Sequence, residues 1–143
     1  MTENLYGRFL KCERGVAALE FVILAPVLLT LIFSIFVYSL YFTALIGVRQ
    51  AAAEGARAAV AGLSASERAT LAQTRAQSVI TSYGAMLSGA KIVAAAASSP
   101  ADTFLVTVTY DMKNAPIMRY GGFVPLPTNK TVSASVTVTN GGY

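Results

Sequence analysis

The stretch GVAALEFVILAPVLLTLIFSIFVYSLYFTALIGV, residues 15–48, decides the fold. From Phe21 to Val48 it holds 28 consecutive residues without a charge, and roughly 18 such residues already suffice for a membrane-span candidate. As a helix this run would extend about 42 Å, whereas the hydrocarbon core of a bilayer measures about 30 Å. The sequence therefore predicts a helix that crosses a membrane and continues beyond it.

Composition outside this stretch indicates a single small domain. The chain has 143 residues, of which 55% are hydrophobic and 13% charged, so intrinsic disorder is excluded. No second uncharged run of comparable length follows, which excludes a polytopic transporter. We expect one membrane span and one small globular domain.

The residue inventory also excludes several kinds of site. The chain contains no His and a single cysteine, Cys12, which rules out His-based nucleophile systems, His-ligated metals and a disulfide within the chain. No G-x-S-x-G motif is present. The net charge of +4 comes from scattered Lys and Arg without a recognition module, so we expect no nucleic-acid partner. We expect no cofactor, no metal and no enzymatic activity.

Charges on either side of the span indicate its orientation. Three basic residues lie within residues 1–15, and only Arg49 and Arg57 lie close behind the span. This bias places the amino terminus in the cytoplasm. A secretory signal peptide is not expected, because its apolar region would be about 7–15 residues long and would end at a small-residue cleavage site.

Two residues of the apolar segment break its simplest pattern. Pro26 removes a backbone hydrogen bond and kinks the helix, which membrane helices tolerate. Glu20 places a carboxylate one turn into the apolar run, where an acid costs up to about 3 kcal/mol at the bilayer centre. Either lipid headgroups solvate Glu20 at the membrane boundary, or the carboxylate has a specific cationic partner.

The sequence Gly15-Val16-Ala17-Ala18-Leu19-Glu20-Phe21, with Pro26 in the apolar run that follows, resembles the processing site of type IV prepilins. Its Glu-Phe pair and early proline are most similar to TadE-like minor pilins, or pseudopilins, of the tight-adherence (Tad/Flp) pilus. The Ala/Glu/Gly/Arg stretch from Ala53 to Arg57 resembles the same family.

The resemblance implies cleavage by a prepilin peptidase between Gly15 and Val16, which makes Glu20 the fifth mature residue. It also implies that Glu20 and Phe21 act in subunit pairing, and that Glu20 neutralises the Val16 α-amine of a neighbouring subunit. The expected partners are the prepilin peptidase, other pilin and pseudopilin subunits and the inner-membrane assembly platform. The expected location is the bacterial inner membrane with a periplasmic carboxyl-terminal domain, and incorporation into a pilus used for adhesion.

A different class of function remains open on the residues alone. A single-pass, signal-anchored envelope protein, either a binding module or an enzyme, would have the same span and domain. It would differ in keeping residues 1–15.

The helix is expected to continue past the membrane to residue 62. Gly47, Ala51, Gly55 and Ala59 recur every four residues and so line one face with small side chains, which lets another backbone approach closely. This face, with Pro26 earlier in the helix, is expected to serve helix packing. Its occupant is either a neighbouring subunit or the sheet of the same chain.

Beyond residue 62 the pattern predicts a second helix over residues 65–83, capped by Ser64 and Glu67. Alternating apolar and hydroxyl residues then predict strands at 91–97, 103–110 and 131–139. The result is an α+β fold, a pilin-like lollipop with a long N-terminal transmembrane and assembly helix and a three-stranded antiparallel sheet. We expect a leader (1–15), an assembly helix (16–62) and a headgroup (63–143).

The connection between the last two strands is long and rich in Pro and Gly. Connections of this length are often functional. Its apolar residues either form a partner surface or are buried against the sheet of their own chain; they are Ile117, Met118, Tyr120 and Phe123.

Overall fold

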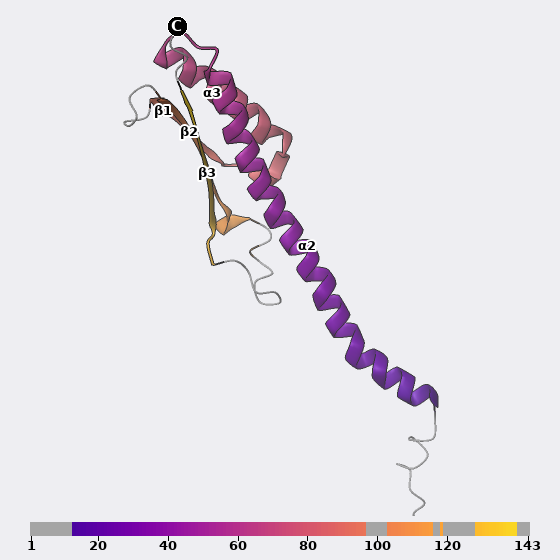
Figure 1. Ribbon diagram of the computed structural model, residues 1–143. Coiled ribbons are helices and arrows are strands. Elements are labelled where there is room, and N and C mark those ends of the chain that lie inside the picture. The colour runs from indigo at the N-terminus through magenta and orange to yellow at the C-terminus, as the bar shows by residue number, and fades with distance from the viewer. Residues whose placement is uncertain (1–12, 97–102, 116–117, 119–127, 140–143) are drawn as a thin grey trace, which may run out of the picture. The chain divides into compact units, whose positions relative to one another are not determined.

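The computed structural model describes residues 13–96, 103–115, 118 and 128–139. Its elements in chain order are α2 (Glu13–Ala59), α3 (Ala65–Ser82), the 3-10 helix η1 (Gly84–Leu87), β1 (Lys91–Ala96), β2 (Thr103–Asp111), the 3-10 helix η2 (Met112–Asn114) and β3 (Thr131–Thr139) (Figure 1). They belong to two units, residues 1–38 and 39–143, and α2 passes from the first into the second. The predicted α+β class is confirmed: a long apolar helix, a second helix and a three-stranded antiparallel sheet.

Within the first unit, α2 keeps its hydroxyl groups bonded inside the helix. The hydroxyl of Thr30 donates to the carbonyl of Pro26 over 2.7 Å, and that of Ser34 donates to the carbonyl of Thr30 over 2.7 Å. These bonds leave few polar groups for the surroundings to satisfy, as a hydrocarbon environment requires. The helix runs through Pro26 without ending.

The second unit contains the sheet, whose order is β1-β2-β3 with both pairings antiparallel. Apolar residues of β2 face the core and pair with apolar residues of β3, as in Val106 opposite Val136. On the other face hydroxyls meet across the same strands, and the hydroxyls of Thr107 and Ser135 lie 2.9 Å apart. The alternation of apolar and hydroxyl residues in the sequence therefore places the apolar side chains on one face of the sheet and the hydroxyl groups on the other.

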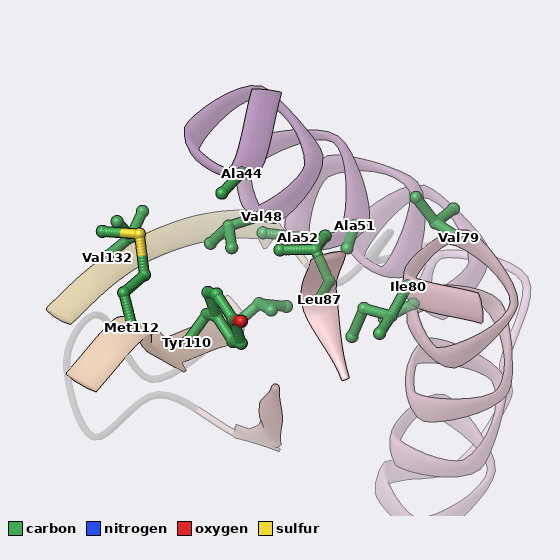
Figure 2. Close-up of a cluster of buried hydrophobic side chains, with 12 residues drawn as sticks. Ala44, Val48, Ala51, Ala52, Val79, Ile80, Leu87, Tyr110, Met112 and Val132 are labelled. Atoms are coloured by element: carbon green, nitrogen blue, oxygen red, sulfur yellow. The ribbon is translucent and has the colours of Figure 1, made fainter. Parts of the chain in front are cut away.

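Two clusters of buried side chains form the core of the second unit. The first joins α2, α3, η1 and the sheet, and Figure 2 shows its α2 side chains facing those of the other elements; it comprises Ala44, Val48, Ala51, Ala52, Ala76, Val79, Ile80, Leu87, Val108, Tyr110, Met112 and Val132. The second lies farther along α2 and comprises Ala56, Ala59, Ala72, Phe104 and Val106. Alanines supply most of the α2 contribution, so the helix lies close to its neighbours.

The helix boundaries follow local chemistry. α2 ends at Ala59, three residues before the predicted end, because the next amides bond three residues back: Val60 donates to Arg57 and Gly62 to Ala59. Such bonds tighten the last turn of a helix and close it. The predicted capping box at the start of α3 is confirmed: Ser64 Oγ accepts from the Glu67 amide over 3.2 Å, and the Glu67 carboxylate accepts from the amide of Leu63 over 2.9 Å.

Candidate functional site

The predicted scissile bond between Gly15 and Val16 lies in the first turn of α2, which begins at Glu13. Gly15 is exposed, and 46% of the surface of Val16 is exposed. First turns of helices fray readily because their amides have no partner within the helix. The bond is therefore placed where the chain can open locally.

Glu20 lies just over one turn beyond that bond, on the exposed surface of α2. It is the only charged residue between positions 15 and 48. Among the residues that the structure describes it makes no hydrogen bond or ion pair. Phe21 beside it is 71% exposed, and Leu24, one turn later, is 65% exposed. A lone carboxylate thus lies on an otherwise apolar surface.

From Leu19 to Phe36, α2 exposes its large apolar side chains. More than half of the surface of each of these residues is exposed: Leu19, Phe21, Val22, Ile23, Leu24, Val27, Leu28, Leu29, Leu31, Ile32, Phe33, Ile35 and Phe36. Within the described part of the chain one helix, Gly15–Ala59, is long and apolar enough to cross a membrane, and only 6% of its most apolar stretch is buried. A core helix of a soluble protein would be mostly buried, so α2 is a candidate membrane anchor.

The small-residue face lies in the second unit, against elements of the same chain. A Cβ added at Gly47 would lie 2.6 Å from Leu87 Cδ1 and 3.1 Å from the Tyr83 ring. Ala51 belongs to the first core cluster and Ala59 to the second, and both are fully buried. A Cβ added at Gly55 would lie 3.0 Å from the Ala72 carbonyl oxygen in α3 and 3.3 Å from Val106 Cγ1 in β2. The sequence left open a neighbouring subunit or the chain's own sheet; in the structure this face contacts α3, η1 and one strand of the sheet, β2, of the same chain.

Of the four apolar residues in the long connection, the structure describes only Met118. It is half-buried and packs against the first core cluster. Ile117, Tyr120 and Phe123 lie outside the described residues.

Two apolar features of the second unit were not predicted. The first is a cavity of about 140 Å³, which we call the socket; it is lined by Leu40, Ala44, Ala85, Met86, Tyr110, Met112 and Ala115. The second is a pair of exposed side chains between α2 and α3, which we call the knob: Val60 is 56% exposed and Leu63 is 92% exposed. Sequence patterns could not reveal the socket, because its walls come from three separate segments of the chain. Leu63 could have been noticed in the sequence, because it is a large apolar residue in the short connection between two helices.

The chain also contains one Ser-x-x-Lys spacing, from Ser88 to Lys91, which was not predicted to be a site. Both residues are exposed, and the Ser88 hydroxyl donates to the Ala85 carbonyl over 3.2 Å. Lys91 begins β1. Asp111 has ordinary capping chemistry, since its carboxylate accepts from the Lys113 amide over 3.0 Å. These arrangements do not form a nucleophile–base pair in a cavity.

Comparison with known proteins finds a match to the amino-terminal part of the chain, which contains most of α2. A protein family described as TadE-like protein matches residues 15–57, which run from the predicted scissile bond to the last turn of α2. No curated protein and no solved structure matches the chain significantly. The predicted family resemblance is thereby confirmed over the segment that carries the exposed apolar surface, Glu20 and three of the four residues of the small-residue face (Gly47, Ala51 and Gly55). From Gly15 to Arg57 this chain is similar to the family of TadE-like proteins.

Proposed function

We propose that this chain is a minor pilin, or pseudopilin, that takes part in assembly of a tight-adherence pilus for surface adhesion. A prepilin peptidase removes residues 1–15, and α2 holds the mature chain in the bacterial inner membrane with its headgroup in the periplasm. The chain then joins other pilin or pseudopilin subunits at an inner-membrane assembly platform. Its role is structural and not catalytic.

The observation that carries this proposal is the lone carboxylate of Glu20 on an exposed apolar helix. Ionised groups inside a membrane are expensive and are retained when they pair with an opposite charge. Cleavage after Gly15 would create a positive α-amine on Val16, and Glu20 would then be the fifth residue of the mature chain. On one helix the α-amine of Val16 and the carboxylate of Glu20 lie about one turn apart. When helices pack side by side, the carboxylate of one copy can therefore pair with the α-amine of the next copy.

The exposed large side chains of α2 support the same role. Once a subunit leaves the bilayer, this surface has to be covered by protein, and parallel packing against the α2 helices of other subunits would cover it. A plain membrane anchor needs apolar side chains but has no use for Glu20, so the carboxylate favours assembly over anchoring alone.

The processing step is tested by intact-mass spectrometry of the chain purified from cells that express a prepilin peptidase. We expect the mass of a chain that begins at Val16. An intact Met1, or a cut at another bond, contradicts the processing step.

The pairing role is tested by Glu20→Gln, which keeps the size of the side chain and removes its charge. We expect normal membrane insertion and a strong loss of pili on the cell surface. Glu54→Gln is the matched control, because it makes the same change on a half-buried carboxylate in the second unit, whose partners Arg57 and Arg75 have exposed side chains that make such ion pairs worth little. Equal piliation in the two variants would refute the pairing role of Glu20.

A further inference from the structure

β3 forms one edge of the sheet, because the strand order is β1-β2-β3 and, among the described residues, β3 pairs with β2 alone. The other edge strand, β1, begins with Lys91 and packs against α3. Edge strands usually carry a charge, a proline or a bulge that keeps other chains from pairing with them. β3 is 9 residues long, contains no charge, proline or glycine, and keeps an unbroken register with β2. Within the described part of the chain, its outer edge is therefore open to another strand.

The register determines which backbone groups of β3 point to this open edge. The Met112 amide donates to the Lys130 carbonyl over 2.8 Å, so these two residues form a hydrogen-bonded pair that continues the ladder between β2 and β3. Such pairs alternate with non-bonded pairs along antiparallel strands, so the even-numbered residues of β3 bond to β2. The odd-numbered residues, with Ser133, Ser135 and Thr137 at the centre, direct their N–H and C=O groups to the open edge.

The core face of the sheet is incompletely covered beside this edge. Val132 at the start of β3 is 4% exposed, whereas Ala134, Val136 and Val138 are only half-buried. The cover that α2 and α3 give to the sheet therefore decreases along β3. An added strand with apolar side chains on this face would remove more of the surface of Val136 and Val138 from water.

Pairing with β3 of a second copy does not suit this edge. α2 and β3 run in the same direction, because Ala44 and Val132 belong to the first core cluster, whereas Ala59 and Val138 lie with the second. Antiparallel pairing of two β3 strands would reverse α2 in one copy, which copies held in one membrane cannot do. Parallel pairing would place the apolar row of one strand beside the hydroxyl row of the other.

Pairing with β1 of a second copy keeps the direction of α2 but fails on width. Three strands span about 14 Å, at about 4.8 Å per strand. α2 and α3 both pack on the core face of the sheet, and two packed helices occupy about 20 Å. The helices of copies joined strand to strand would therefore overlap. An extended segment that has no helices beside it fits this edge.

We propose that the open edge of β3 binds an extended segment of a different subunit, which adds a fourth strand to the sheet. The proposal rests on the proposed function, since it names the kind of contact by which this chain joins other subunits. The segment is uncharged where it pairs, and it alternates apolar residues on the core face with Ser or Thr on the hydroxyl face. It runs antiparallel to β3, so that opposite residues share a face and exchange both backbone hydrogen bonds.

The test measures the binding of a fluorescein-labelled peptide to the full-length chain in detergent micelles by fluorescence anisotropy. The peptide has the sequence TFLVTVTY, residues 103–110 of β2, which shows the required alternation. In the sheet the other edge of this strand pairs with β1, which runs parallel to β3. A peptide of the same composition without the alternation is the control, and we expect the β2 peptide to bind about tenfold more tightly.

Ser135→Pro removes an amide that points to the open edge and leaves the bonds to β2 in place. We expect it to weaken peptide binding roughly tenfold, whereas Ser135→Ala, which keeps the amide, leaves binding unchanged. The midpoint of urea unfolding shows whether Ser135→Pro folds. The unchanged chain gives a second measurement: a peptide N-methylated at Leu105 and Thr107 should not bind, whereas one N-methylated at Val106 and Val108 should bind, because its methyl groups point away from β3.

Three outcomes overturn the proposal. The first is equal binding of the alternating and the control peptide, or of the two N-methylated peptides. The second is an equal loss of binding in Ser135→Ala and Ser135→Pro, which shows that the hydroxyl group and not the backbone is recognised. The third is self-association of the unchanged chain in micelles that Ser135→Pro abolishes, which shows a second copy at this edge.

These outcomes are independent of the proposed processing and assembly, because the peptide assay needs neither the peptidase nor the pilus machinery. Cleavage after Gly15 without peptide binding overturns only the added strand. Peptide binding by a chain that keeps residues 1–15 in cells overturns only the processing step.

Discussion

Gly55→Leu tests most directly what the small-residue face of α2 contacts. A Cβ at Gly55 would lie 3.0 Å from the Ala72 carbonyl oxygen, 3.2 Å from Ala76 Cβ and 3.3 Å from Val106 Cγ1. The first contact is with the backbone of α3, which cannot rotate away, and leucine adds three more carbons. Over-packing of this kind costs about 3 kcal/mol, and the gain in helix propensity over glycine returns only about 0.8 kcal/mol. We therefore expect a net loss of stability of about 2 kcal/mol.

The sign of the change is what makes this variant informative. If the face were open to solvent in the single chain and reserved for a neighbouring subunit, Gly55→Leu would raise the stability through helix propensity alone. Urea titration of the full-length chain in micelles, followed by near-ultraviolet circular dichroism, measures the unfolding of the second unit. Ala58→Gly, three residues away, calibrates the propensity effect with a predicted loss of up to about 1 kcal/mol. A midpoint for Gly55→Leu equal to or above that of the unchanged chain would refute the packing described for Gly55.

Three further predictions use the same titration. Phe104→Ala should cost about 3–5 kcal/mol, since Phe104 is 1% exposed in the second core cluster, whereas Phe36→Ala, at a 59% exposed position of the first unit, should leave the midpoint unchanged. Ser64→Ala should cost about 1 kcal/mol through loss of the cap on α3, with Ser64→Gly costing less. Burial, and secondarily the Asp111 carboxylate, raises the pKa of Tyr110 above its ordinary value near 10. The native state therefore holds the Tyr110 proton more tightly than the unfolded state does. The contribution of Tyr110 to the free energy of unfolding is constant below about pH 10 and falls as the pH rises through the raised pKa. Tyr110→Phe should reduce that fall.

Much of the sheet could be predicted because its signal is local. Val132, Val136 and Val138 alternate with hydroxyl residues, and β3 covers the residues that this alternation marks, 131–139. β2 extends one residue past its predicted carboxyl end, and β1 covers 91–96 of the predicted 91–97, with position 97 outside the described residues. α3 was also predictable, since its start depends on the capping pair and its end on Gly84, which adopts a φ of +59° that other residues rarely take.

The occupant of the small-residue face could not be predicted, because spacing defines a face and not its neighbour. Gly47 meets Leu87 and Tyr83, and Gly55 meets α3 and β2; these residues are 17 or more positions away in the chain. The two 3-10 helices were missed for a related reason. η1 contributes the fully buried Leu87 to the core, so tertiary burial and not a periodic pattern marks this short segment.

In the candidate site, too, linear features could be predicted from the sequence, whereas features formed by distant segments could not. Gly15, Glu20 and the apolar run could be marked as candidates because a short motif and an uncharged run are linear features, and linear features keep their signal in the sequence. The socket is different, since Ala44, Ala85 and Tyr110 reach it from α2, η1 and β2. Only the folded chain brings them together.

The contrast between the two parts of α2 explains how one continuous helix serves two environments. Both parts are apolar, but from Leu19 to Phe36 the helix carries mainly Leu, Ile, Val and Phe, whereas from Ala51 to Ala59 it carries mainly Ala and Gly. Large side chains hold neighbouring backbones apart and present a broad surface to lipid or to other helices. Small side chains let α3 and the sheet approach until the faces of Ala51, Ala52, Ala56 and Ala59 are fully buried. Hydrophobicity alone would place the whole helix in one environment; side-chain volume separates the part that folds with its own chain from the part left exposed.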